Sequence, residues 1–219
     1  MFEGFSDAAV DLFWNIRFHN DREWFRPHKD EFKQLVMQPV RALAEELQDR
    51  LNEGDPKLRL NLHISRVYRD SRRLFGAGPL NDHIWFSLQT GDEYSRSPCL
   101  WFEVGADGIR YGMGYWMQAA DAARYRRLID SDPMAFARLV RAFDRQDSFV
   151  LEGEEYARSK GHDGDPIGHW YNKRWIGAAC ERAHDAVSAS HALAEVVEDG
   201  FRFLLPYFLF LEKVHHMAE

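Results

Sequence analysis

The hydrophobic positions of the first 54 residues recur at helical spacing. Ser6 is a suitable N-cap for a first helix, and Pro27 suits the first turn of a second helical region that continues to Gly54. Pro39 should kink or restart that second region. The apolar stripe of the first helix, which we expect to face a core, consists of Val10, Phe13, Trp14 and Phe18.

After Pro56 the hydrophobic pattern becomes extended, with four runs over residues 61–68, 83–89, 99–104 and 109–116. Asp107 and Gly108 stand between the last two runs, and they supply the positive φ values of a tight hairpin. In the fourth run Gly112 and Gly114 share one face, and this gap admits either another backbone or a ligand. The pattern therefore predicts an antiparallel sheet.

Helical spacing returns over residues 119–129 and 133–143, where Asp132 is a good cap and Pro133 a good first residue. The order of elements predicts one α+β domain over residues 1–219, with an N-terminal helical pair and a largely antiparallel sheet covered by helices. The remaining expected elements are short strands at 152–156 and 175–180, a loop at 159–168, a short helix from Asp165-Pro166 to Trp170, and a closing helix at 190–214.

The composition narrows the function classes. The chain has 219 residues, a formal charge of -7 and ample aromatic side chains for a core, and its acidity argues against a nucleic-acid partner. Two cysteines are too few to stabilise a secreted fold of this size through disulfide bonds, and no signal peptide is evident. The longest apolar stretch, Phe203 to Leu211, is too short to span a bilayer. We therefore expect a soluble, cytoplasmic protein.

The most unusual charge pattern is an arginine cluster around Asp70. Guanidinium groups this close repel one another, so either carboxylates such as Asp70 and Glu103 or an anionic ligand must compensate them. In an unbroken strand Arg66 and Arg69 point to opposite faces, so only a subset converges. The cluster consists of Arg66, Arg69, Arg72 and Arg73. The predicted site for a phosphate or carboxylate uses the first three of these arginines, with Arg22 and Trp24 contributed by the link between the first two helices and Lys160 by a later loop.

A second candidate is the glycine-rich loop that starts at Lys160. Backbone N–H groups and a lysine before a helix start are suited to an anion, although the loop lacks the full phosphate-loop pattern and is equally consistent with a solvated turn. A metal site would need His162, Asp163, Asp165 and His169, but no known ligand spacing supports it. We expect neither a metal nor another cofactor.

No nucleophile stands in a known catalytic signature. The candidate nucleophiles, which one of the ten histidines would have to activate, are Ser65, Ser71, Cys99 and Cys180. None of them lies in a nucleophile elbow or a cysteine-enzyme motif. Glu23 and Asp70 are the candidates for an acid–base pair if the fold brings them together.

Several short motifs arrive in an order that resembles a known family. They are Asn20 to Phe25, Arg69 to Arg72, Gly112 to Gly114, Lys160-Gly161 and Asp165-Pro166. Together they resemble the DUF2461 family of conserved hypothetical bacterial proteins, and the resemblance spans most of the chain. It implies a compact α+β domain and no established activity. Where many members carry a lysine-containing stretch, this chain has Arg73 to Leu80 without lysine, so Arg73 or Lys160 would have to replace that charge.

Two functions fit these features. The first is a protein that binds, or acts on, an anionic small molecule through the arginine cluster. The second is a non-catalytic interaction module, with a protein partner or a second copy of itself, whose arginines are structural. Arginines that converge on a concave pocket without acidic partners would favour the first, and arginines fully paired with acids beside an exposed apolar patch would favour the second.

Overall fold

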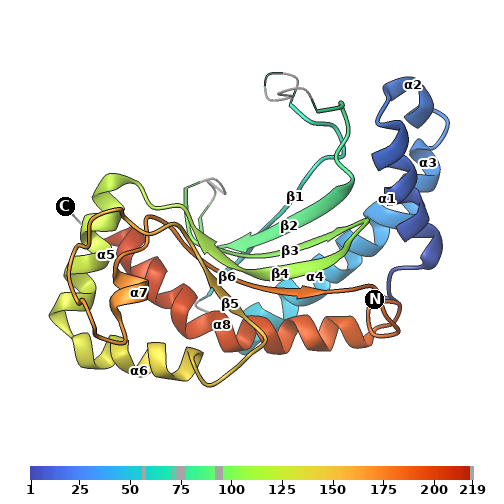
Figure 1. Ribbon diagram of the computed structural model, residues 1–219. Coiled ribbons are helices and arrows are strands. Elements are labelled where there is room, and N and C mark those ends of the chain that lie inside the picture. Colours follow the sequence, from blue (N-terminus) through green and yellow to red (C-terminus); the bar gives the residue numbers. More distant parts are fainter. Residues whose placement is uncertain (56–57, 71, 73–76, 92–95, 218–219) are drawn as a thin grey trace. The chain divides into compact units, whose positions relative to one another are not determined.

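The computed structural model describes residues 1–55, 58–70, 72, 77–91 and 96–217. Their strands form one six-stranded antiparallel sheet in the order β1-β2-β3-β4-β6-β5, and the α+β class predicted from the sequence is confirmed (Figure 1). β5 pairs antiparallel with β6, with Val150 opposite Ala179. The strands are β1 (Asn61–Ile64), β2 (His83–Gln89), β3 (Cys99–Gly105), β4 (Gly108–Tyr115), β5 (Val150–Glu152) and β6 (Ile176–Arg182).

The helices follow the predicted order with shifted boundaries. Pro27 lies in the turn between α2 and α3, not in a first helical turn as expected, whereas Pro39 does restart a helix after the π-helical turn η1. α8 continues through Gly200 and Pro206. The helices are α1 (Asp7–His19), α2 (Arg22–Phe25), α3 (Lys29–Phe32), η1 (Lys33–Met37), α4 (Gln38–Gly54), α5 (Ala119–Ser131), α6 (Pro133–Phe143), α7 (Gly168–Tyr171) and α8 (Ala192–His216).

The chain divides into two compact units, and each is described by itself. Unit 1 consists of Met1–Leu88, Trp101–Tyr111 and Glu181–Gly200, and unit 2 consists of Gln89–Leu100, Gly112–Cys180 and Phe201–Glu219. Strands β2, β3, β4 and β6 and helix α8 each run from one unit into the other. The single domain over residues 1–219 stays a prediction.

In unit 1, helix α1 buries a different stripe from the one predicted. Ser6 caps the helix by accepting a hydrogen bond from Ala9 N, as expected. Phe13 is fully buried, but Trp14 is 37% exposed and Phe18 is 76% exposed. The buried face is formed by Ala9, Leu12, Phe13 and Ile16, which also recur at helical spacing, so the small Ala9 and the aliphatic side chains face the core while the two large aromatics stack on each other outside.

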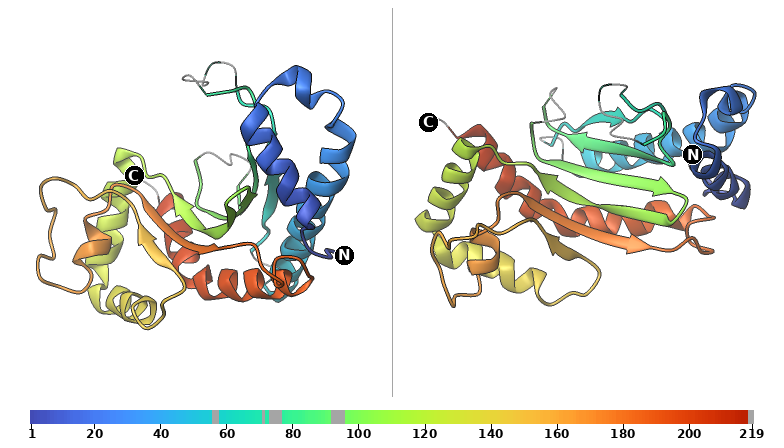
Figure 2. Two further views of the ribbon diagram at one scale, coloured as in Figure 1. Left: turned by 45° about the vertical axis from the view of Figure 1, so that its right-hand side comes forward. Right: turned by 45° about the horizontal axis from the view of Figure 1, so that its top comes forward.

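The strands of unit 1 have one covered face and one open face. On the covered face Phe86 and Phe102 are fully buried, with their ring centroids 5.2 Å apart. Helix α4 and the first part of α8 lie on that side, and the described helices of this unit leave the other face uncovered (Figures 1 and 2). The uncovered face carries half-buried polar and aromatic side chains, namely His83, Trp85, Trp101 and Glu103. This face is where a site is available.

Two glycines fix how β4 meets its neighbours. Gly108 has φ +145°, and a Cβ there would lie 2.3 Å from the carbonyl oxygen of Arg182, which explains why the predicted Asp107-Gly108 turn needs glycine. A Cβ on Gly112 would lie 1.9 Å from the carbonyl oxygen of Ala178. The space beside Gly112, which was predicted to admit either another backbone or a ligand, is therefore occupied by the backbone of β6.

Unit 2 has a core of aromatic side chains from α5, α6, α7 and the second part of α8. Trp170 packs edge-on against Phe143 and stacks on Tyr207, whose hydroxyl donates to Leu139 O. Asp132 caps α6 through Ala135 N, as predicted. The short strand expected at 152–156 is instead β5, and Glu155 forms only an isolated bridge with Lys173. Among the described residues, no helix is both long enough and apolar enough to cross a membrane.

Candidate functional site

Two arginines of the cluster expected to bind an anion form hydrogen bonds with acceptors of the protein itself. Arg72 donates to Asp70 from its backbone N, from Nε and from Nη2, at 3.0, 3.0 and 2.8 Å. Arg69 Nε donates to Leu80 O at 2.8 Å, and Arg69 N donates to Pro79 O at 2.9 Å. These contacts correspond to the structural interpretation of the cluster. Ser71 and Arg73 lie outside the described residues.

The other predicted residues of this site are on the surface of unit 1. The Arg22 guanidinium lies 5.8 Å from the Tyr68 ring centroid, a cation–π distance, and Arg66 is exposed. Trp24 stacks between His19 and His28, with centroid distances of 4.6 and 4.2 Å. Neither of the two cavities described in unit 1 is lined by Arg22, Arg66, Arg69 or Arg72.

The two candidate carboxylates are differently placed. Asp70 accepts the hydrogen bonds of Arg72, so its lone pairs are already engaged. Glu23 is exposed in the first turn of α2, where its backbone N donates to the capping Asp21. Asp70 therefore pairs with a neighbouring arginine, and Glu23 lies on the surface of another element.

The glycine-rich loop belongs to unit 2. The Lys160 ammonium lies 4.9 Å from the Tyr156 ring centroid. His162 Nε2 lies 3.0 Å from Asp130 Oδ1 and its Nδ1 lies 3.5 Å from Asp165 Oδ2, whereas His169 pairs with Glu155, so the two histidines contact different carboxylates. Within the described ranges, no group of three or more histidine, cysteine or acidic side chains has the geometry to hold a metal ion.

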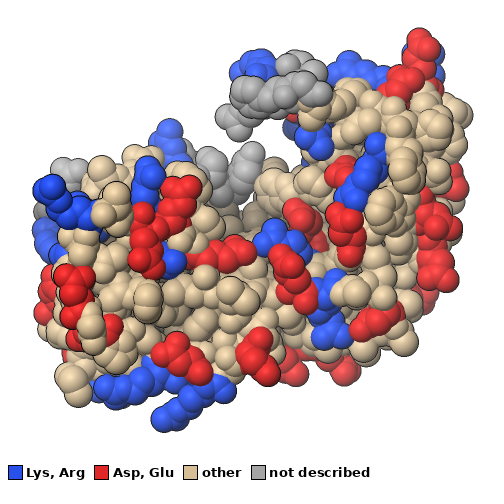
Figure 3. Space-filling model, viewed as in Figure 1, with Lys and Arg blue, Asp and Glu red and all other residues tan. Residues whose placement is uncertain are grey.

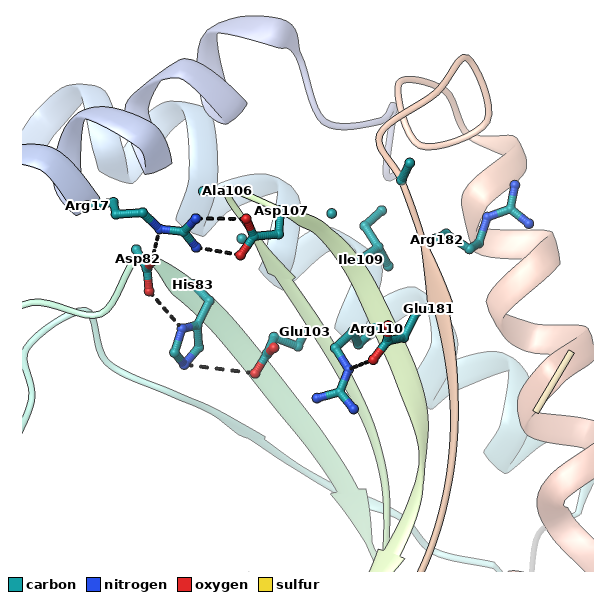
Figure 4. Close-up of a pocket in the computed structure, with 13 residues that line it drawn as sticks. Arg17, Asp82, His83, Glu103, Ala106, Asp107, Ile109, Arg110, Glu181 and Arg182 are labelled. Carbon is teal, nitrogen blue, oxygen red and sulfur yellow. Dashed lines mark hydrogen bonds and ion pairs between the residues drawn. The ribbon is translucent and has the colours of Figure 1, made fainter. Parts of the chain in front are cut away.

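A cavity of about 310 Å³ opens on the uncovered face of unit 1 (Figure 4). Four neighbouring strands and helix α1 contribute to its walls. In Figure 4 the polar and charged side chains of β2, β3 and β4 point into it. The charged and polar residues that line it are Arg17, Asp82, His83, Glu103, Asp107, Arg110, Glu181 and Arg182, and the side chain of Arg182 extends to the other side of β6 in the figure.

Arg17 connects α1 to the strand ends. Its Nη1 and Nη2 donate to the two carboxylate oxygens of Asp107, at 2.7 and 2.6 Å, and its Nε donates to Asp82. A guanidinium with two carboxylates in this fork geometry fixes both acids in place. The arrangement holds the β3–β4 turn and the start of β2 against the helix.

Asp82 in turn holds a histidine. His83 Nδ1 lies 3.2 Å from Asp82 Oδ1, and because an ionised carboxylate only accepts, Nδ1 carries the proton. His83 Nε2 then lies 3.8 Å from Glu103 Oε2. This nitrogen is beyond hydrogen-bond distance from Glu103, so it is available to a molecule in the cavity.

Arg110 lies on the next strand beside Glu103. Its Nε is 2.8 Å from Glu181 Oε1, and its guanidinium carbon is 5.5 Å from the Trp101 ring centroid. The Glu181 side chain is 71% exposed, so this ion pair is screened by water and contributes little to stability. On the face shown in Figure 3, many basic side chains lie beside acidic ones in the same way.

The Arg17 contacts change the acidity of both aspartates. Burial alone would raise the pKa of Asp82, but hydrogen bonds from Arg17 and His83 more than offset it, so the pKa of Asp82 is lowered. The hydrogen bonds that Arg17 donates also lower the pKa of Asp107, and because Asp107 and Asp82 accept them, the pKa of Arg17 is raised. All three groups stay charged over the physiological range.

Neither cysteine has the environment of a nucleophile. Burial raises the pKa of the Cys99 thiol to about 12, and its Sγ lies 3.7 Å from Gly114 O. A thiol in this state is inert at neutral pH. Cys180 is buried in β6, and both thiols are free.

From the sequence, Glu103 was predicted only as a structural partner of the arginines. The predicted site residues did not include the other polar residues of this cavity, namely Arg17, Asp82, His83, Asp107 and Arg110. Part of this cavity could have been predicted from the alternation of hydrophobic and polar residues in the extended runs. Because alternate residues share a face, His83 and Trp85 lie with Trp101 and Glu103 opposite the hydrophobic face. The partner of each charge could not be identified without the pairing of strands.

The fold and the cavity define a class of protein: an α+β chain whose antiparallel sheet has a cavity lined by charged side chains on its uncovered face. Residues 8–210 match the family described as "Conserved hypothetical protein (DUF2461)", and the chain belongs to this family. The resemblance drawn from short motifs is thereby confirmed. No curated protein matches the chain.

Proposed function

We propose that the protein binds a small molecule with a carboxylate or phosphate group in the cavity of unit 1, with Arg110 as the anion-binding side chain. The observation that carries this proposal is the row of polar and charged side chains across β2, β3, β4 and β6, formed by His83, Glu103, Arg110 and Glu181. Such convergent polar groups in a cavity are typical of a ligand site.

The anionic group would replace Glu181 on Arg110. Because the Glu181 side chain is 71% exposed, its ion pair is easily exchanged, and Trp101 keeps the guanidinium in place when Glu181 leaves. The net charge of the lining does not favour a simple anion, since Asp82, Glu103 and Asp107 are also present. The ligand therefore also carries a hydroxyl or amino hydrogen, which Glu103 or His83 Nε2 accepts.

Proton transfer to or from this ligand is assigned to His83. Asp82 fixes the imidazole tautomer, and Arg17 fixes Asp82, so Nε2 faces the ligand in a defined orientation. Asp70 and Glu23, the carboxylates selected from sequence, line neither of the cavities described in unit 1. Free thiols at Cys99 and Cys180 support a cytoplasmic location for this activity.

The experiment is a thermal-shift screen of small hydroxy- and amino-carboxylates and their phosphate esters. A ligand that binds only the folded protein raises its melting temperature in a saturable way. We expect the shift to disappear in Arg110→Gln and His83→Gln and to persist in Arg66→Gln and Arg22→Gln, which remove arginines of the sequence-predicted site.

The opposite pattern, with loss in Arg66→Gln and Arg22→Gln alone, would move the site to the arginine cluster. If no compound raises the melting temperature in a saturable way, the ligand proposal is wrong. Circular dichroism of each variant shows whether a loss of binding reflects a loss of folding.

A protein-interaction role is the second candidate, and one observation favours it. Trp14 and Phe18 stack at 5.9 Å on the outer face of α1, with 37% and 76% of their surfaces exposed. Aromatic pairs of this kind are frequent at protein interfaces. Sedimentation equilibrium of the wild type and Phe18→Ser tests self-association, because a monomeric wild type excludes it and a dimer abolished by the substitution supports it.

A further inference from the structure

Two cations of unit 2 converge on one aromatic ring. The Lys160 ammonium lies 4.9 Å from the Tyr156 ring centroid, and the Arg126 guanidinium carbon lies 5.5 Å from the same centroid. Arg126 comes from α5, Tyr156 from the segment before the glycine-rich loop, and Lys160 from the start of that loop. Within the described part of the chain, neither cation forms an ion pair with a carboxylate. The fold therefore brings together two like charges that no acid neutralises directly.

The Arg126 guanidinium also has an unsatisfied donor. Its Nη1 is buried and finds no hydrogen-bond partner among the described residues. A buried donor without an acceptor destabilises the folded state, and a neighbouring ammonium adds repulsion. A bound oxygen anion would relieve both costs at once.

The nearest helical candidate for pairing with Arg126 is engaged elsewhere. Asp130, four residues further along α5, accepts hydrogen bonds from Tyr171 OH at 2.9 Å and from His162 Nε2 at 3.0 Å. The hydrogen bond from His162 lowers the pKa of Asp130, so Asp130 is a carboxylate that is held away from the guanidinium. Its long-range attraction for Arg126 remains, but the direct contact is absent.

The loop that carries Lys160 is held by a buried side chain. Asn172 Oδ1 accepts from Lys160 N at 2.6 Å, and Asn172 Nδ2 donates to Gly161 O at 3.1 Å and to Gly168 O at 2.9 Å. His162 has φ +58°, an uncommon value for a residue with a side chain, and it is held there by Asp130 and Asp165. A loop fixed in this way presents Lys160 beside Arg126 before any ligand arrives.

We propose that Arg126 and Lys160 bind a phosphate group at the Tyr156 ring. A phosphate carries close to two negative charges at neutral pH, which matches the two cations, and its oxygens suit both a guanidinium fork and an ammonium. This site differs from the cavity of unit 1 in its residues and in its ligand, since it requires no hydrogen-bond donor on the ligand.

The test is a calorimetric titration with inorganic phosphate at constant ionic strength. We expect saturable binding by the wild type and a loss of affinity of about tenfold or more in Arg126→Gln and in Lys160→Gln. The matched controls are Arg127→Gln and Arg158→Gln, which remove exposed positive charges next in sequence to Arg126 or close to Lys160. These controls should bind phosphate as the wild type does.

A wild type that shows no saturable binding of phosphate overturns the proposal, and so does an equal loss in the control variants, which would indicate nonspecific attraction. Because Lys160 is exposed, Lys160→Gln folds normally, and its melting temperature verifies this. Arg110→Gln should retain phosphate binding, so failure of the cavity proposal and failure of this one are distinguishable.

Discussion

Each unit contains a group of basic side chains, and the two groups are neutralised differently. In unit 1 Arg17 is bound by Asp107 and Asp82. In unit 2 Arg126 and Lys160 share the Tyr156 ring and have no carboxylate in direct contact among the described residues. The first arrangement stabilises a fold without needing a ligand, whereas the second leaves an electrostatic cost that a ligand can remove.

The comparison also separates proximity in sequence from proximity in space. Arg69 and Arg72 are neighbours along the chain, yet one binds a backbone carbonyl and the other binds Asp70. Arg126 and Lys160 are far apart along the chain and meet at one ring. A cluster of charges in the sequence is therefore a poor guide to the place where charge accumulates.

The largest expected effect distinguishes a crowded turn in unit 1 from an open turn in unit 2. Gly108→Ala should lower the free energy of unfolding by about 3 kcal/mol, because φ is +145° and the new Cβ would meet a carbonyl oxygen at 2.3 Å. Gly164→Ala should cost only about 1 kcal/mol, since φ is +77° but nothing lies within 4 Å of the Cβ. Urea unfolding measures both, and equal costs would show that the turn beside the cavity is not crowded.

Next in size is the loss of a paired arginine. Arg17→Gln should lower the free energy of unfolding by about 2 kcal/mol, because Asp82 is left part-buried without its guanidinium. The exposed Arg127→Gln should stay within about 0.5 kcal/mol of the wild type in the same urea experiment. A cost for Arg17→Gln as small as that of Arg127→Gln would mean that the Arg17 network does not stabilise unit 1.

The acid dependence of stability tests the same network with a smaller effect. The pKa values of Asp82 and Asp107 are lowered in the folded state, so their contribution is complete above the unfolded value of about 3.9 and is lost as pH falls through the folded values. The urea midpoint of the wild type should fall in this acid range, and Arg17→Gln should show a shallower fall. Parallel profiles would contradict the assignment.

In unit 2 the expected pH dependence has the opposite sign. The hydrogen bond with Asp130 raises the pKa of His162, so the contribution of this pair is complete below the unfolded value of about 6.5 and is lost as pH rises through the folded value. His162→Gln should remove this alkaline loss while leaving the acid limb from Asp82 and Asp107 intact. Chemical shifts of the imidazole provide the direct measurement of the raised pKa.

The smallest effect is expected for the unpaired arginine. Arg126→Gln should leave the unfolding free energy within about 0.5 kcal/mol of the wild type or raise it, because the substitution removes a repulsion with Lys160 and breaks no ion pair. A strongly destabilised Arg126→Gln would contradict this account of the Tyr156 cluster. Added phosphate should stabilise the wild type more than this variant.

Local signals in the sequence predicted much of the fold. The Asp107-Gly108 turn, the cap at Ser6 and the Asp132-Pro133 start of α6 depend on neighbouring residues, and each is present in the structure. The stripe of α1 was misplaced because Trp14 and Phe18 fit helical spacing as well as Leu12 and Ile16 do. Hydrophobicity alone did not show which of two adjacent stripes faces the core.

The candidate sites were harder to predict because they depend on long-range pairing. Arg17 meets Asp82 and Asp107 through the packing of α1 on strand ends, which no local pattern encodes. Lys160 was selected from its loop, but Arg126 is one of many arginines on a predicted helix until Tyr156 identifies it. Charged side chains lack the periodic signal that hydrophobic side chains give, so their partners follow only from tertiary structure.

The division of α8 and four strands between the units has a practical consequence for dissecting the protein. Neither unit is a continuous stretch of the chain, because the division falls after Leu88, Leu100, Tyr111, Cys180 and Gly200. No single truncation or proteolytic cut can release either unit whole. A gene fragment that encodes the unit 1 cavity must also encode most of unit 2, so the two binding proposals have to be separated by point substitutions and not by deletion.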